Sequence, residues 1–145
     1  MYEYIEFIIC YGQGIKPEEM KEETRKEEVV YVRQLIMYFC RKYNIGSLRA
    51  IGEMTAGKDH ATVSHSVKTI NNYIDTDKVK KVQIEYYDML LGKVLTLAKQ
   101  KDDLKELMKP LEKEISELEQ RCINLTLQLA FLRKKTTLGE VMANG

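Results

Sequence analysis

Several residue types are scarce in this sequence, and their scarcity excludes classes of fold. The 145 residues contain two prolines, eight glycines and no tryptophan, whereas sandwiches and barrels need many Gly- and Pro-rich turns between short strands. Long stretches rich in Leu, Lys and Glu favour helices instead. The composition therefore predicts an all-α protein, and the length predicts one compact domain or one small domain plus an extension.

Cysteine is also scarce, since only Cys10, Cys40 and Cys122 are present. Their odd number, wide separation and lack of a CxxC pair argue against a disulfide framework or a zinc site. No run of about 18 apolar residues occurs, and the first ten residues lack the basic start of a signal peptide. These absences predict a soluble cytoplasmic protein.

The formal net charge of +1 is the sum of segments with opposite charge. Residues 1–28 hold eight acids and four bases, residues 29–72 two acids and six bases, and residues 73–145 twelve acids and thirteen bases. A basic patch can therefore exist in the middle of the chain although the total is close to neutral. The sum does not exclude an anionic partner such as nucleic acid.

The spacing of apolar residues predicts several helices in the first half of the chain. They span residues 2–11, 29–44, 48–55 and a run from residue 60 through residue 74, with residues 16–28 as a loop or a poorly anchored turn of helix. The first helix should end at Gly12 and Gly14, and Ser47 and Asp59 are candidate N-caps. Because only Ala56-Gly57-Lys58 separates the last two helices, they form a helix-turn-helix candidate.

The second half of the chain is dominated by one apolar stripe with the heptad spacing of a coiled coil. The stripe consists of Leu104, Met108, Leu111, Ile115, Leu118, Cys122, Leu125, Leu129 and Leu132. Its phase extends back through Leu97, Val94 and Leu90 with Lys101 as one polar position, and Pro110 implies a kink or a helix start. We expect self-association through this helix, with the alternative that the helix covers its own domain. The predicted boundaries are 1–90 for the helix-turn-helix domain, 91–135 for the coiled coil and 136–145 for a flexible tail.

No pattern of residues indicates catalysis. Gly52 to Lys58 matches GxxxxGK, but a phosphate-binding loop needs Ser or Thr next, where Asp59 stands, and a preceding strand. His60 and His65 are five residues apart, so one helical face does not present both to a metal. The sequence predicts a protein that is not an enzyme and that has no cofactor and no metal.

The most specific stretch runs from Arg33 to Ile70 and reads RQLIMYFCRKYNIGSLRAIGEMTAGKDHATVSHSVKTI. It combines an RQ-led helix, SLxxIG at residues 47–52, and GKDHATVSHS at residues 57–66 without a gap. This combination closely resembles the DNA-binding C-terminal domain (domain IV) of the bacterial chromosomal replication initiator DnaA, a Trp-repressor-like helix-turn-helix. The resemblance extends more faintly over residues 5–14 and 73–90, and the initiator's ATPase domain has no counterpart in it.

The resemblance implies a role for individual residues of this chain. The residues in base-contacting places are Arg25, Asp59, His60 and Ala61. The residues in phosphate-contacting places are Arg33, Gln34, Arg41, Leu48, Arg49, Lys58, Thr62 and His65. Three positions depart from the family pattern: Ala61 replaces a threonine, Lys58 replaces an arginine, and glutamates surround Arg25, where the family has a basic loop.

The resemblance implies sequence-specific binding of double-stranded DNA, in recognition of a replication origin or in control of initiation. The implied partners are double-stranded DNA and replication proteins, and the implied location is the nucleoid within the cytoplasm. A second copy of the chain is expected as a further partner from the apolar stripe. Two alternatives remain open at this point. One is a helix-turn-helix transcription regulator, and the other is a coiled-coil interaction protein whose DNA-binding face has degenerated.

Overall fold

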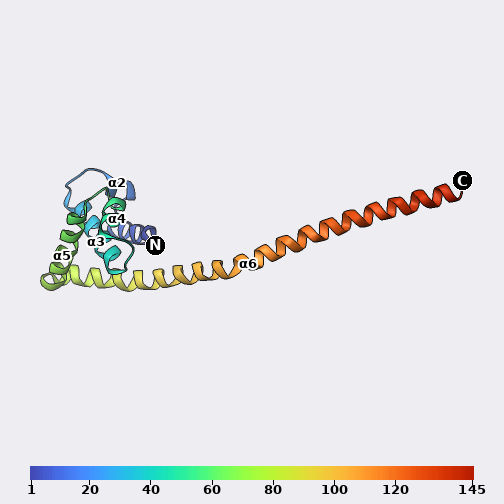
Figure 1. The fold of residues 1–145 in the computed structure, drawn as a ribbon. Helices are drawn as coiled ribbons and strands as arrows, with labels where there is room; N and C mark the ends of the chain where they lie inside the picture. Colours follow the sequence, from blue (N-terminus) through green and yellow to red (C-terminus); the bar gives the residue numbers. More distant parts are fainter. The chain divides into compact units, whose positions relative to one another are not determined.

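The computed structural model describes residues 1–145 and contains six α-helices and no strand, which confirms the all-α prediction (Figure 1). The helices are α1 (Tyr2–Gln13), α2 (Pro17–Lys21), α3 (Glu27–Lys42), α4 (Leu48–Met54), α5 (His60–Thr76) and α6 (Lys78–Ala143). The chain divides into two units, Met1–Lys99 and Gln100–Gly145. None of the helices combines the length and apolar character that a membrane crossing requires.

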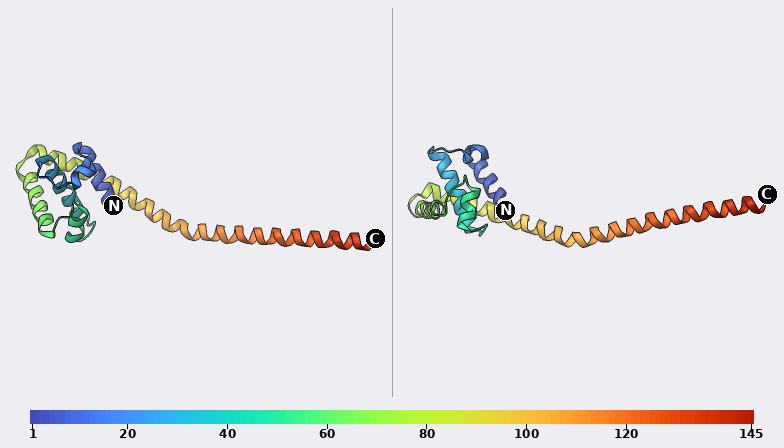
Figure 2. Two further views of the ribbon diagram at one scale, coloured as in Figure 1. Left: turned by 90° about the horizontal axis from the view of Figure 1, so that it is seen from above. Right: turned by 45° about the horizontal axis from the view of Figure 1, so that its top comes forward.

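Helix α3 is the central element of the first unit. It packs against α1, α2, α4 and α5, as the views in Figure 2 allow the reader to follow. Its first turn is acidic and its last turn basic, which complements the helix dipole. One face of this helix is buried, with no exposed area at Leu35, Ile36, Phe39 or Cys40. Burial of these side chains is the main source of stability for the unit.

The segment before α3 is better anchored than the sequence indicates. The sequence predicts a loop or a loosely held turn at residues 16–28, but this segment contains the five-residue helix α2, which begins at Pro17. Met20 inserts into the core and is fully buried. One apolar residue in a polar stretch produces no periodic pattern, so the sequence does not reveal that Met20 anchors this segment in the core.

The part of α6 that belongs to the first unit buries a different face from the one the sequence favours. The buried residues of this part are Ile84, Tyr87, Leu91, Leu95 and Ala98. The expected backward extension of the stripe does not form the packing face, because Leu97 is 64% exposed. Two apolar stripes overlap here, one residue apart, and packing into the core of the first unit decides between them. The buried face continues past residue 90, where the sequence places the end of the domain.

The second unit is the rest of α6, and all of its side chains are exposed. The helix continues through Pro110, which is therefore not a helix start. It also includes residues 136–143, which the sequence assigns to a flexible tail. Gly139 is the weakest helix former in that stretch, and a single glycine costs too little to end a long helix.

Candidate nucleic-acid interface

Helices α4 and α5 form the helix-turn-helix, and both begin at the predicted N-caps. Ser47 Oγ accepts a hydrogen bond from the backbone N–H of Ala50 at 3.2 Å. Asp59 Oδ1 accepts from the backbone N–H of Thr62 at 2.7 Å. Each cap satisfies a donor that the first turn of a helix would leave without a partner. The start of α5 is thereby fixed, and base-reading side chains are expected at this end of a recognition helix.

The turn between the two helices depends on a close approach of the backbone to Gly52. The N–H of Lys58 donates to the carbonyl of Gly52 at 2.7 Å. A Cβ atom added to Gly52 would lie 2.1 Å from the carbonyl oxygen of Lys58, which is closer than atoms can approach. Ala56 and Gly57 both have positive φ, at 58° and 61°, so the turn is left-handed at two successive residues. Gly52 thus determines how closely α4 and the start of α5 can pack.

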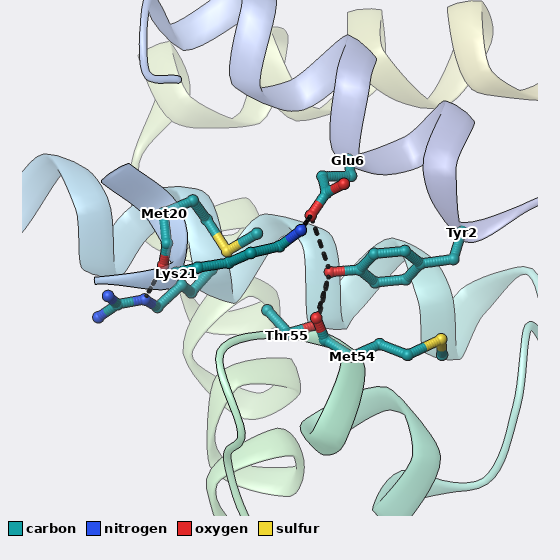
Figure 3. Close-up of polar contacts among 7 residues, drawn as sticks. Tyr2, Glu6, Met20, Lys21, Met54 and Thr55 are labelled. Atoms are coloured by element: carbon teal, nitrogen blue, oxygen red, sulfur yellow. Dashed lines mark hydrogen bonds and ion pairs between the residues drawn. The ribbon is translucent and has the colours of Figure 1, made fainter. Parts of the chain in front are cut away.

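A hydrogen-bonded contact from α1 supports the end of α4 (Figure 3). The hydroxyl of Tyr2 donates to the carbonyl of Met54 at 2.9 Å and lies 3.4 Å from Oγ1 of the buried Thr55. Burial raises the pKa of Tyr2, so the phenol remains a donor at any physiological pH. Beside it, Lys21 Nζ lies 3.1 Å from Glu6 Oε1 and joins α2 to α1. No local sequence pattern indicates this role of Tyr2, because its partners lie about fifty residues away.

The predicted base-contacting residues of α5 lie on the surface at its first turn. Asp59, His60 and Ala61 are all exposed. Hydrogen bonds from the side chain and then the backbone of Thr62 lower the pKa of Asp59, so its carboxylate is charged at neutral pH. A carboxylate can accept from cytosine N4, and the Ala61 methyl can contact thymine. Asp59 therefore serves as the helix cap while its carboxylate stays exposed.

The predicted phosphate-contacting residues are placed unequally. Arg41, Arg49 and His65 are exposed, whereas Gln34, Leu48, Lys58 and Thr62 are partly buried. Arg49 Nε lies 3.0 Å from Glu53 Oε1 on the next turn of α4. This pair is open to solvent and contributes little to stability, so the guanidinium can exchange Glu53 for a phosphate at small cost.

Arg33, a predicted phosphate contact, lies inside the first unit, where it holds the segment before α3. Its side chain is 6% exposed. Nε donates to the carbonyl of Met20 at 2.7 Å, Nη1 donates to the carbonyl of Thr24 at 2.9 Å, and Nη2 donates to the carbonyl of Glu22. Burial lowers the pKa of its guanidinium. All three guanidinium nitrogens are engaged with the segment that leads to Arg25.

Arg25 and Gln34 meet at one cavity of about 440 Å³. Its lining also includes Glu27, Glu28, Tyr31, Tyr73 and Lys80. Lys80 Nζ lies 3.6 Å from the ring centroid of Tyr73, a cation–π contact. The structure therefore brings together a predicted base contact and a predicted phosphate contact, but two glutamates stand beside them. Repulsion between these carboxylates and DNA phosphates opposes close approach at this point.

Comparison with known proteins points to one family for the first unit. Residues 2–70 match the family described as bacterial dnaA protein helix-turn-helix. Three similar proteins, each a chromosomal replication initiator protein DnaA, come from Flavobacterium psychrophilum, Bacteroides thetaiotaomicron and a Wolbachia of Brugia malayi. Their identities are 40% over 76 residues, 33% over 86 residues and 46% over 64 residues. The matches cover 52%, 59% and 44% of this chain but only 16%, 18% and 14% of those relatives.

Proposed function

We propose, from the DnaA-like helix-turn-helix domain that residues 2–70 form, that this protein binds a specific double-stranded DNA sequence in the recognition of a replication origin or the control of initiation. The observation that carries the proposal is the exposed, capped start of α5, where Asp59, His60 and Ala61 stand on the surface within a helix-turn-helix of this family. Reading of base edges from the start of the second helix is the known use of this motif. In this proposal the protein acts without catalysis and works in the cytoplasm at the nucleoid.

Roles within the interface divide into base reading and backbone contact. Asp59 and His60 can reach base edges from the first turn of α5, whereas Arg41 and Arg49 present exposed guanidinium groups suited to phosphate. Arg25 is the residue whose contribution depends most on charge, because Glu27 and Glu28 share its cavity. We assign Arg33 to support of the Arg25 segment and the remaining predicted residues to phosphate contact.

Substitution of Asp59 can separate its role as the N-cap of α5 from its proposed role in reading a base. Asp59→Asn keeps an oxygen that caps α5, since Asn is as good an N-cap as Asp, but it replaces the carboxylate that accepts from a base. We expect Asp59→Asn to keep the melting temperature and to weaken binding to the selected site about tenfold. Asp59→Ala, which removes the cap as well, should lower both the melting temperature and the affinity for the selected site. The measurements are thermal unfolding and fluorescence anisotropy on a duplex selected from a random pool.

Arg41→Ala is the matched control, because a phosphate contact weakens binding to all sequences alike. It should lower affinity for the selected and the random duplex by the same factor. Equal effects of Asp59→Asn on the two duplexes would contradict base reading by Asp59. Binding to neither duplex, at any salt concentration, would favour the alternative of a coiled-coil protein with a degenerate DNA-binding face.

The second part of the proposal is self-association through residues 104–132 of α6. The eight Leu, Ile and Met side chains of the predicted stripe are each 47–59% exposed, and Cys122 between them is exposed too. An apolar stripe of this length in water is stabilised by burial against another helix. Replication proteins remain candidate partners for the same surface.

A substitution within the stripe tests self-association directly. Leu118→Lys places a charge at the middle of the stripe, where desolvation of an ammonium is costly, so the associated state should be lost. Sedimentation equilibrium at about 100 μM, above the micromolar range of ordinary association, is the measurement. Glu117→Lys, one residue away on the outer face, is the control and should leave the mass unchanged. A wild-type protein that is monomeric at this concentration would refute self-association.

A further inference from the structure

The charges that border the apolar stripe of α6 are largely grouped by sign along its length. With Met108 at heptad position a, the flanking positions e and g carry the acids Glu112, Glu114 and Glu119 and, nearer the end of the helix, the bases Arg133 and Lys135. Lys105, Arg121 and Glu140 also occupy flanking positions. All eight are exposed. The ion pairs within this part of the chain are Lys109–Glu106 and Lys113–Glu117, so the flanking charges have no partner in their own chain.

A parallel pair of these helices would bring like charges together. In that arrangement position g of one helix faces position e of the next heptad of its partner. Glu114 would face Glu119 of the second copy, and the symmetry would create this repulsion twice. Parallel pairing would also create one attraction, between Lys135 and Glu140. This pair lies beyond Leu132, where Thr136 and Gly139 occupy positions a and d and bury little apolar surface. The acidic middle therefore disfavours parallel pairing.

An antiparallel pair brings opposite charges together. When one helix is reversed, residues at position g lie opposite residues at position g of the partner, and residues at position e lie opposite residues at position e. In the register that sets Leu118 opposite Leu129 and Cys122 opposite Leu125, Glu114 lies two residues along the axis from Lys135 of the second copy. This offset is about 3 Å, within reach of both side chains. Symmetry gives two such pairs.

The other flank and the ends of the stripe agree with this register. Arg133 of the second copy lies at a level between Glu112 and Glu119. At the ends, Leu107 faces Met142, both of which are more than two-thirds exposed in the single chain. A shift of the register by one heptad in one direction places Arg121 opposite Arg121 of the second copy. A shift by one heptad in the other direction places Arg121 opposite Lys135 of the second copy. Both shifts bring positive charges together. The charges therefore select one register as well as one orientation.

We propose that α6 pairs with α6 of a second copy as an antiparallel coiled coil in this register, held by Glu114–Lys135 pairs. The proposal rests on the self-association proposed above and specifies its geometry. Charge complementarity along the flanks identifies the occupant of the stripe as the same segment running the other way. A further apolar stripe, Ile123, Leu127 and Phe131, lies on the opposite side of the helix and is exposed as well.

Reversal of one charge tests the orientation, because the two arrangements respond with opposite sign. Glu114→Lys in the full chain sets the new ammonium against Lys135 in the antiparallel pair, and we expect the dissociation constant for self-association to rise about tenfold. In a parallel pair the same change would create two attractions between the new ammonium and Glu119, and it would lower the constant. Glu114→Lys combined with Lys135→Glu restores the antiparallel pairs and should return the constant to the wild-type value. Glu117→Lys carries the same charge change on the outer face and is the control.

A distance measurement provides a readout that does not depend on stability. Spin labels at Lys113→Cys, in a Cys122→Ala chain, should lie about 30 Å apart in the antiparallel register and no more than about 20 Å apart in a parallel pair. Cys10 and Cys40 are buried and stay unlabelled. A short distance, or an unchanged or lower dissociation constant for Glu114→Lys, would overturn the antiparallel arrangement alone. A wild-type chain that sediments as a monomer would overturn self-association itself.

Discussion

Gly52→Ala is expected to lower the free energy of unfolding by about 2–3 kcal/mol and to abolish sequence-specific DNA binding. The added methyl group would lie 2.1 Å from the Lys58 carbonyl oxygen and 3.2 Å from that of Asp59. Both neighbours are backbone atoms, so relief requires the turn to move away from α4. That movement breaks the hydrogen bond from Lys58 N–H to Gly52 and displaces the cap at Asp59. The base-reading end of α5 would then be misplaced as well as destabilised.

Gly46→Ala is the matched control for this prediction. A Cβ atom at Gly46 would lie 3.5 Å from Ala50 Cβ, which is ordinary van der Waals contact. The same change of residue type, six positions earlier, should therefore alter stability and DNA affinity little. Thermal unfolding and anisotropy on the selected duplex measure the two effects. Equal melting temperatures for the two variants would show that the turn can shift without cost, and the role assigned to Gly52 would be incorrect.

Arg33→Met is expected to lower the free energy of unfolding by about 2–4 kcal/mol. Methionine preserves the packing of the stem but removes the donors to the carbonyls of Met20, Glu22 and Thr24, and hydrogen bonds from a charged donor each stabilise by about 1.5–3 kcal/mol. The freed carbonyls nearer the surface can accept hydrogen bonds from water instead, which limits the total loss of stability. The segment before α3 should loosen, and hydrogen exchange at residues 17–26 should speed up more than in the rest of the first unit.

The salt dependence of DNA binding separates this structural role from a phosphate contact. Removal of a phosphate contact lowers the slope of log affinity against log salt by about one, whereas loss of an internal support leaves it unchanged. Arg41→Met is the control, since Arg41 is exposed on the same helix and is expected to change the slope without affecting stability. If Arg33→Met keeps the native melting temperature and lowers the slope, then Arg33 contacts phosphate and its buried position is not maintained on DNA.

Local chemistry makes much of this protein predictable from its sequence. The helix-turn-helix can be located because Ser47 and Asp59 are N-cap residues that act within their own first turns, and because apolar spacing is a property of each helix alone. The stripe from Leu104 to Leu132 is recognisable for the same reason. The resemblance carried by residues 33–70 places the base-contacting residues on the first turn of α5, which the structure exposes.

The tertiary structure decided those features that depend on contacts between distant residues. The resemblance gives Arg33 and Gln34 the same predicted phosphate-contacting role, but the helical rotation between neighbours turns Arg33 toward the carbonyls of the α2 segment while Gln34 stays partly exposed. The need for glycine at position 52 follows from the path of the turn around Lys58, and no local pattern reveals it. In α6 the sequence contains two overlapping stripes, and only packing against the other helices selects the face of Leu91 and Leu95. Periodicity determines that a helix has an apolar face, whereas the shape and polarity of the surrounding core determine which residues that face buries.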